Sequence, residues 1–198
     1  LWLLILTFIN FSYFSRSNNR STKERLLTVI FQQIIIFGFT AFLIFTSNPF
    51  NEIFPSPKEG LGLNPILQDP LLAIHPPILY LGYVSTSIIF SSGLSSLVMG
   101  NVNSNWASHI KKWILCSWIF LTGGILLGSI WAYYELGWGG FWFWDPVENI
   151  SLMPWISLTA LLHCILVLEK RSSLGSWSII LCISTFTLSV CGTFLVRS

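Results

Sequence analysis

Three histidines are the residues of this 198-residue chain whose neutral imidazoles could ligate a metal ion. His75 begins the motif HPP after a long irregular segment, His109 stands two residues before a pair of lysines, and His163 stands inside an apolar run. The four cysteines form no CxxC pair, so neither a zinc site nor a redox dithiol is indicated. No serine or cysteine nucleophile with a paired base is indicated either. The histidines are therefore the candidates for chemistry.

An aromatic stretch lies between two apolar runs at residues 131–149, WAYYELGWGGFWFWDPVEN. It is too polar to cross a bilayer and too apolar for an ordinary solvated loop, which favours a position at a membrane surface, where amphipathic rings settle. Three closely set glycines, Gly137, Gly139 and Gly140, would let the backbone turn sharply and approach a ligand. An interfacial aromatic belt is the simpler alternative, but it accounts only for one or two tryptophans at a helix end.

A porphyrin matches both features, because it is a large flat ring that needs an axial nitrogen ligand and stacking surfaces. His75 could supply the nitrogen, and the indole rings could supply the surfaces. The candidate haem-contacting residues of the stretch are Trp131, Trp138, Trp142, Trp144 and Asp145. The sequence thus predicts an outward haem site with His75 as the iron ligand.

The acidic residues of the stretch have a structural alternative. Asp145-Pro146 favours the end of the aromatic segment and the start of a helix, with Glu148 near the positive end of that helix. Contact with a donor protein, or protonation during haem transfer, is the other role that remains open for them.

His163 lies fourteen residues after Asn149, which is about 20 Å of helix rise. That depth places it inside the membrane, where an ionisable side chain indicates function; the alternative is a hydrogen bond to a neighbouring helix. A haem iron bound there would belong to a second, intramembrane site. His109 is expected to be solvated in a basic loop.

The composition defines the elements that must position these residues. The chain is 53% hydrophobic and 9% charged, which predicts an all-α, polytopic transmembrane bundle forming a single membrane domain over 1–198. About six spans are expected, at 1–14, 26–46, 76–98, 113–133, 151–168 and 174–195. Because proline suits the first turn of a helix, Pro76 and Pro77 are expected to open the third span and leave His75 at the membrane edge.

Eight of the ten basic residues fall in one alternating set of loops, which the positive-inside rule assigns to the cytoplasm or matrix. The aromatic stretch then faces the periplasm or intermembrane space. The net charge of +2, without a basic tract, predicts no nucleic-acid binding. The expected surroundings are a lipid bilayer.

Four motifs resemble the CcmF family of cytochrome c maturation, the membrane haem lyase subunit. In chain order they are HPPILYLGYV, WAYYELGWGGFWFWDPVEN, ALLHCILVLEKR and GTFLVRS. The aromatic stretch is similar to that family's WWD signature, with Phe141 where the family usually has Trp. The resemblance covers most of residues 70–198. It implies a subunit of the system I haem lyase, which attaches haem to the CxxCH thiols of apocytochrome c.

The resemblance also implies residue roles, cofactors and partners. His75 matches an axial ligand of haem delivered by the chaperone CcmE, and His163 matches a ligand of a resident b-type haem. A second outward histidine is expected just after GTFLVRS, where this chain ends, so we expect one piece of a split CcmF, or a fragment of a longer reading frame. It would act beside a CcmH-like protein and the pieces carrying the remaining histidines, not alone.

The abundance of Ile, Phe and Ser with little charge is typical of an organellar gene, which predicts the mitochondrial inner membrane, with a bacterial inner membrane as the alternative. Two other functions remain open. One is a haem transport or presentation module without lyase activity, and the other is a structural subunit of a respiratory complex, which would bind no haem.

Overall fold

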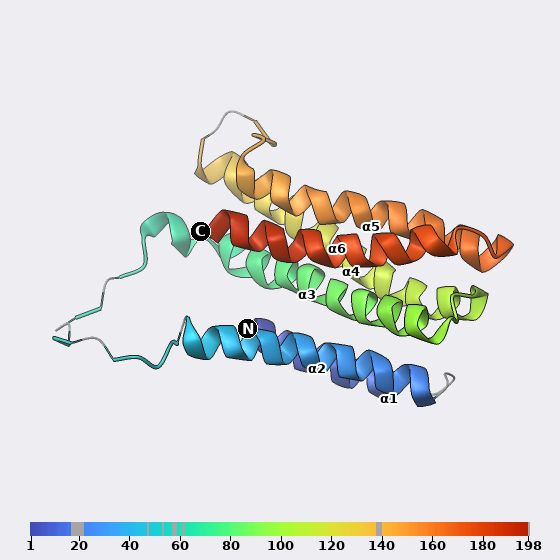
Figure 1. Ribbon diagram of the computed structural model, residues 1–198. Coiled ribbons are helices and arrows are strands. Elements are labelled where there is room, and N and C mark those ends of the chain that lie inside the picture. The colour runs from blue at the N-terminus through green and yellow to red at the C-terminus, as the bar shows by residue number, and fades with distance from the viewer. Residues whose placement is uncertain are drawn as a thin grey trace.

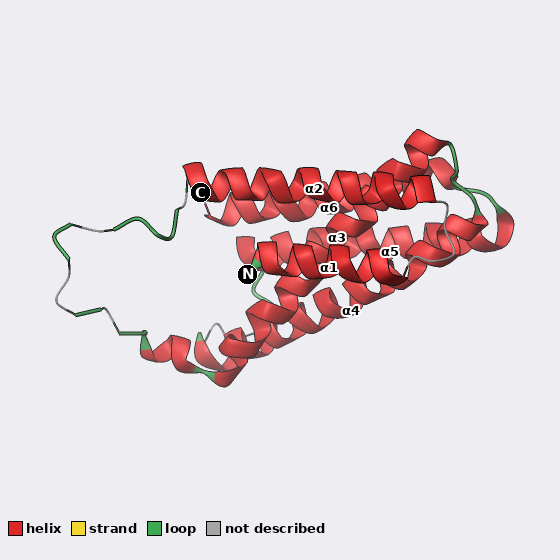
Figure 2. Cartoon of the chain, turned by 90° about the horizontal axis from the view of Figure 1, so that it is seen from below, coloured by secondary structure: helices red, strands yellow, loops and turns green. Residues whose placement is uncertain are grey.

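A computed structural model (Figure 1) describes residues 1–16, 22–46, 48–52, 54–56, 59–60, 62–137 and 140–197. Within these ranges the regular structure is helical, and no strand occurs (Figure 2). The elements are α1 (Trp2–Arg16), α2 (Thr22–Phe45), the 3₁₀ helix η1 (Pro65–Gln68), α3 (Pro70–Met99), α4 (Ser104–Glu135), α5 (Pro146–Arg171) and α6 (Gly175–Arg197). The prediction of an all-α bundle is confirmed.

Five of these helices, α2 to α6, are long and apolar enough to cross a bilayer. The expected first span forms the apolar helix α1, but its 15 residues are too few for a full crossing. The bundle therefore has five candidate spans and one shorter helix in place of about six spans.

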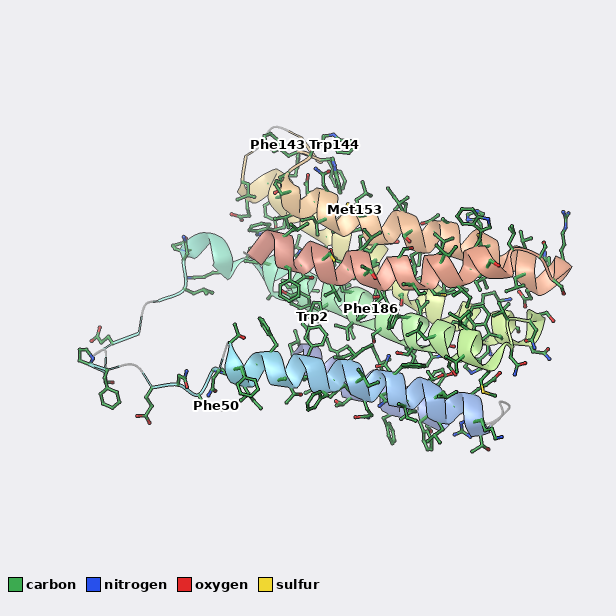
Figure 3. All side chains as sticks on the ribbon, viewed as in Figure 1. Trp2, Phe50, Phe143, Trp144, Met153 and Phe186 are labelled. Atoms are coloured by element: carbon green, nitrogen blue, oxygen red, sulfur yellow. The ribbon has the colours of Figure 1, made fainter. Side chains whose placement is uncertain are left out.

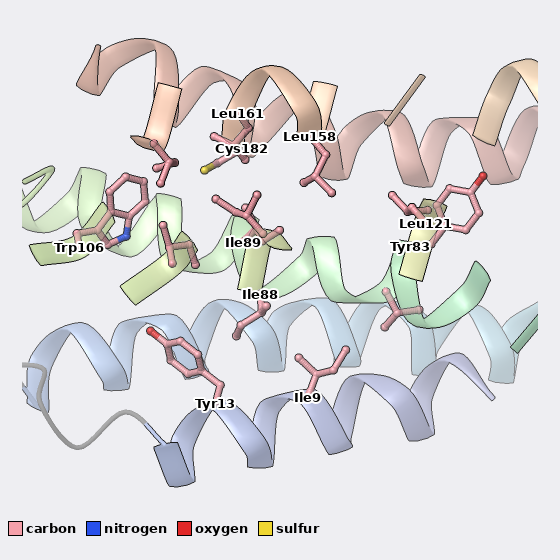
Figure 4. Close-up of a cluster of buried hydrophobic side chains, with 14 of the residues drawn as sticks. Ile9, Tyr13, Tyr83, Ile88, Ile89, Trp106, Leu121, Leu158, Leu161 and Cys182 are labelled. Carbon is pink, nitrogen blue, oxygen red and sulfur yellow. The ribbon is translucent and has the colours of Figure 1, made fainter. Parts of the chain in front are cut away.

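Helix α3 is the centre of the bundle. It packs against α1 and α2 on one side and against α4 and α6 on the other, while α5 packs on α4 and α6. Figure 4 shows the two sides, with Ile88 of α3 directed towards Tyr13 of α1, and Ile89 directed towards Leu161 and Cys182. All five side chains are buried.

Polar side chains also join the helices in the core. The Gln32 amide of α2 donates to the hydroxyls of Ser87 and Ser91 on α3, at 3.1 and 3.2 Å. The indole of Trp106 on α4 donates to Ser92 at 3.1 Å. These buried polar groups are paired, as a bundle in lipid requires.

Two helix starts differ from the prediction. Asp69, whose side chain accepts the N–H of Leu71 at 2.7 Å, caps α3, and Pro70 opens it. Pro76 and Pro77 lie inside the helix, so the prediction that they open the span was wrong. Helix α4 likewise starts at Ser104, capped by Asn103, well before the expected residue 113.

The two ends of the bundle differ in charge. The turns after α1, α3 and α5 lie at one end, and the connections after α2 and α4 lie at the other, together with the C-terminus (Figure 1). The first end carries basic residues of α2, α4 and α5, and there Lys111 pairs with Glu169 at 2.6 Å. The second end carries Asp69, Asp145 and Glu148. We call these the basic end and the acidic end.

Candidate functional site

The connection between α4 and α5 is held by the residues that start α5. The Asp145 side chain accepts the N–H of Glu148 at 2.6 Å, and Pro146 occupies the first turn, where its missing N–H leaves no partner unpaired. The prediction that Asp145-Pro146 starts a helix is confirmed.

Glu148 continues this arrangement back into the aromatic segment. Its Oε2 accepts the backbone N–H groups of Phe143 and Trp144 at 2.9 and 2.8 Å, and Asn149 donates to the Trp144 carbonyl at 2.9 Å. The side chains of Phe143 and Trp144 are exposed and lie on the outside of the connection (Figure 3). Glu148 therefore fixes the backbone of the segment while two of its rings remain at the surface.

His75 lies in the second turn of α3 and is partly buried against α4. Its Nδ1 is 2.6 Å from the carbonyl oxygen of Gly124. A carbonyl oxygen only accepts hydrogen bonds, so Nδ1 must carry the proton and donate. In the neutral ring this leaves the lone pair on Nε2, which is the form that ligates a metal.

Two glycines of α4 allow the imidazole to approach the helix. A Cβ on Gly128 would lie 2.5 Å from Cε1 of His75, and one on Gly124 would lie 2.7 Å from Cα of Leu79. Both distances are shorter than real Cβ contacts, so only glycine lets α3 and α4 come this close. The pattern is the GxxxG spacing that brings membrane helices together.

A cavity of about 350 Å³ opens beside this histidine at the acidic end. Its lining comes from α3, α4, α5, α6 and the connection between α4 and α5, and it includes His75, Trp131, Trp142 and Asp145. Four of the residues that the sequence singled out, separated by up to seventy positions, thus meet around one space. The volume lies within the range of ligand pockets.

The remaining residues of the predicted outward site lie elsewhere. Trp144 is 68% exposed and does not line the cavity, although its ring packs edge-on against Trp142 with centroids 6.0 Å apart. Trp138 and Gly139 lie outside the described residues. His75 lies inside α3, because the helix starts at Pro70 and not, as predicted, at Pro76. Its expected position at the membrane edge stays a prediction.

His163 occupies an outer face of α5 and is exposed in this chain. Its Nδ1 donates to the carbonyl oxygen of Thr159, one turn earlier in the same helix, at 2.8 Å. The neutral ring again has its lone pair on Nε2. The described part of the chain contains no cluster of three or more His, Cys, Asp or Glu side chains suited to a metal ion.

His109 was expected to be solvated in a loop, and this was wrong. It lies within α4, because that helix starts early, and its ring packs edge-on against Tyr13 of α1 with centroids 5.6 Å apart. It contributes to helix packing at the basic end.

Sequence reasoning missed a pair of tryptophans between α4 and α5. Trp118 and Trp155 stack with centroids 5.9 Å apart, and each indole donates to a threonine of the opposite helix, Thr159 at 2.9 Å and Thr122 at 2.8 Å. In both helices the threonine follows the tryptophan by four residues, so W-x-x-x-T in two neighbouring spans was the available signal.

The fold and the cavity define a class: a multi-pass helical membrane protein with a histidine and tryptophans around a cavity at one end of the bundle. The whole chain, residues 1–198, matches the family described as Cytochrome C assembly protein, so the chain belongs to that family.

Its relatives agree with this assignment. The chain is 54% identical over its full length to the cytochrome c-type biogenesis protein CycK of Rhizobium meliloti, of which it covers 29%, and 49% identical to CcmF of Escherichia coli, of which it covers 31%. A solved structure of the cytochrome c haem lyase CcmF superposes with a TM-score of 0.82 over 98% of this chain and 30% of that one, at 30% identity. The chain thus spans about 30% of the length of these proteins.

Proposed function

We propose that this chain is a subunit of a cytochrome c haem lyase and presents haem in the cavity at its acidic end, with His75 as an axial ligand of the iron. One observation carries the proposal: an imidazole whose Nε2 lone pair is free for a metal lies in the same cavity as Trp131 and Trp142. Family membership and the similarity to CcmF proteins support it.

The residues of the cavity fit a haem. A single neutral imidazole is a usual axial ligand, and aromatic and aliphatic side chains suit the faces of the ring. The second nitrogen of His75 is fixed by the Gly124 carbonyl, which orients the ring as such partners do in metal sites. Asp145 contributes as the cap of α5 and not as an iron ligand.

The chain supplies binding and orientation, not a nucleophile. In thioether formation the sulfur of each apocytochrome thiol bonds to one carbon of a haem vinyl group and the proton adds to the other carbon, so no electron is gained or lost. The nucleophile thus belongs to the protein substrate. The haem would come from a chaperone of the CcmE type, and a CcmH-like protein would present the apocytochrome CxxCH segment.

His163 would ligate a second, resident b-type haem whose other axial ligand belongs to another polypeptide. Its exposure supports this proposal, because a nitrogen on an outer helix face is available to a neighbouring chain. The chain spans about 30% of such proteins, so most of a CcmF-like protein lies outside this sequence.

We further propose that the chain is part of a CcmF-like protein of the mitochondrial inner membrane, with the aromatic connection in the intermembrane space. The composition supports the organelle, and the charges of the bundle ends support the orientation. The curated relatives named above are bacterial, so the equivalent location in a bacterium is the inner membrane with the connection in the periplasm.

Optical spectroscopy of the complex, purified from its native membrane through a tag on this chain, tests the proposal. We expect reduced-minus-oxidised and pyridine haemochrome spectra of b-type haem, with further CcmF-like polypeptides in the preparation. Haem-free protein among respiratory subunits would contradict the proposal and favour a structural role.

The substitution His75→Ala gives the sharper measurement. Haem supplied to the complex should no longer be captured in the cavity, while the spectrum of the resident haem persists. Wild-type capture, or wild-type yield of holocytochrome c in cells with this variant, would exclude His75 as the ligand.

A further inference from the structure

Two tryptophans that line the cavity have indole nitrogens without a hydrogen-bond partner among the described residues. Nε1 of Trp131 and Nε1 of Trp142 are both shielded from the surface. The indoles of Trp106, Trp118 and Trp155, by contrast, each donate to a serine or threonine hydroxyl. Buried polar groups nearly always have a hydrogen-bond partner. Two indole N–H groups without one at the same cavity therefore indicate that a ligand with hydrogen-bond acceptors binds there.

Five of the polar side chains that line the cavity already have other partners. The hydroxyls of Ser129 and Thr193 donate to carbonyls of their own helices, and that of Ser151 donates to the Glu148 carbonyl. The Asp145 and Glu148 carboxylates accept backbone N–H groups. No acceptor among the described lining residues is bonded to either indole nitrogen, so both N–H groups are available to an acceptor on a bound ligand.

We propose that the indole N–H groups of Trp131 and Trp142 bind the propionate oxygens of the porphyrin, an inference that rests on the proposed function. An indole nitrogen only donates, so it requires an acceptor. The ring nitrogens of a haem are bound to iron, and the rest of the macrocycle is hydrocarbon. The propionates are thus the part of the ligand that carries hydrogen-bond acceptors.

The charges around the cavity bear on how this group is held. The lining contains no lysine or arginine among the described residues, and it contains Asp145 and Glu148. The start of α5, the positive end of its helix dipole, lies at the same place and offsets these carboxylates. Neutral donors bind a carboxylate less strongly than a bidentate arginine does. Weaker binding suits a ligand that is transferred to another protein.

Holding one edge of the haem also determines where the other edge lies. The two vinyl groups are on the pyrrole rings that carry no propionate. Indoles that bind the propionates therefore select, from the ways a flat ring can enter the cavity, those in which the vinyl groups point away from Trp131 and Trp142.

The test compares iron protoporphyrin IX with its dimethyl ester, in which the propionates cannot be carboxylates. Each is titrated into the purified complex in lipid nanodiscs, and binding is followed by absorbance. The variants are Trp131→Phe, Trp142→Phe and the double variant, which keep an aromatic ring and remove the N–H group. Trp177→Phe is the control, because this tryptophan of α6 is exposed and outside the lining.

We expect the wild type to bind the acid more tightly than the ester, and the double variant to bind the acid at least about tenfold more weakly than the wild type does, because hydrogen bonds to a charged acceptor are lost. The ester keeps its carbonyl acceptors but loses the negative charge, so the double variant should lose less affinity for the ester than for the acid. Trp177→Phe should leave both affinities unchanged.

Equal loss of affinity for acid and ester in the double variant would show that the indoles only pack against the ring, and would overturn the inference while leaving the haem site in place. Equal binding of acid and ester by the wild type would overturn it without any variant, so misfolding cannot hide the answer. Absence of binding of either compound, or wild-type binding of haem by His75→Ala, would instead overturn the proposed function itself.

Discussion

His75 and His163 share one local arrangement and differ in everything around it. In both residues Nδ1 donates to a backbone carbonyl, at 2.6 and 2.8 Å, which leaves Nε2 free. The carbonyl that orients His75 belongs to another helix, α4, whereas the one that orients His163 belongs to its own helix, one turn earlier. The orientation of the His75 ring thus depends on the packing of two helices, and that of the His163 ring depends only on the helix that carries it.

The surroundings of the two residues show what each site needs. His75 lies in a cavity built from four helices and one connection of this chain, while His163 stands exposed on the outside of α5. A ligand at His75 would be surrounded by the described residues, and a ligand at His163 would need further groups from outside them. The described residues therefore enclose the surroundings of His75 and leave those of His163 open.

The substitution His163→Ala is expected to have the largest effect and to separate the two sites most clearly. The complex should lose its resident haem entirely, while capture at the cavity continues, because no packing depends on an exposed side chain. The haem content per complex, measured as pyridine haemochrome, checks this. Leu166→Ala, which shortens an exposed apolar side chain on the same helix, is the control and should retain the haem.

A smaller effect is expected at the contact between α3 and α4. Gly128→Ala would place a methyl group against the His75 imidazole and displace its bond to the Gly124 carbonyl. Loss of such an orienting partner lowers metal affinity about 10–100-fold. Haem titration measures it.

Gly123→Ala is the matched control for that measurement. On the same helix, its Cβ would lie 3.7 Å from Ile78, an ordinary contact, so affinity should not change. The same affinity in both alanine variants would mean that α4 does not position His75.

The smallest effect is expected from Trp118→Phe, which removes one hydrogen bond between α4 and α5 in the region that separates the two sites. The variant should lose only about 0.6 kcal/mol of stability, the average for such bonds in membrane bundles. Thermal unfolding in detergent measures this, with the exposed Trp177→Phe as reference. A change in haem capture at His75 would contradict the separation of the two regions.

The sequence predicted those parts of the structure that depend on local chemistry. The apolar runs predicted the five long helices, and Asp145-Pro146 predicted the start of α5, since capping involves neighbouring residues. The predicted start of α3 was wrong because two prolines could each occupy the first turn of the helix. Pro70 follows a capping aspartate, whereas Pro76 follows a histidine. The cap decides between them.

The site depended on contacts that a linear pattern does not contain. His75 and the aromatic stretch were singled out from their residue types, but which rings share a cavity with the histidine depends on how α3 and α4 cross. The glycines at 124 and 128 set that crossing, and their spacing was legible in the sequence. The exclusion of Trp144 from the lining could not be predicted from the sequence, because it follows from the hydrogen bonds between Glu148 and the backbone of the connection.

The two prolines inside α3 give the first turns of that helix a mechanical property. Neither Pro76 nor Pro77 has an N–H group, so the carbonyls of Leu72 and Ala73 lack their usual partners four residues on. Two successive missing hydrogen bonds weaken the helix at this point, and His75 lies directly before it. The turn that carries His75 can therefore yield without disturbing the rest of the bundle. Under the proposed function, this would let a bound haem be released by a movement of one turn.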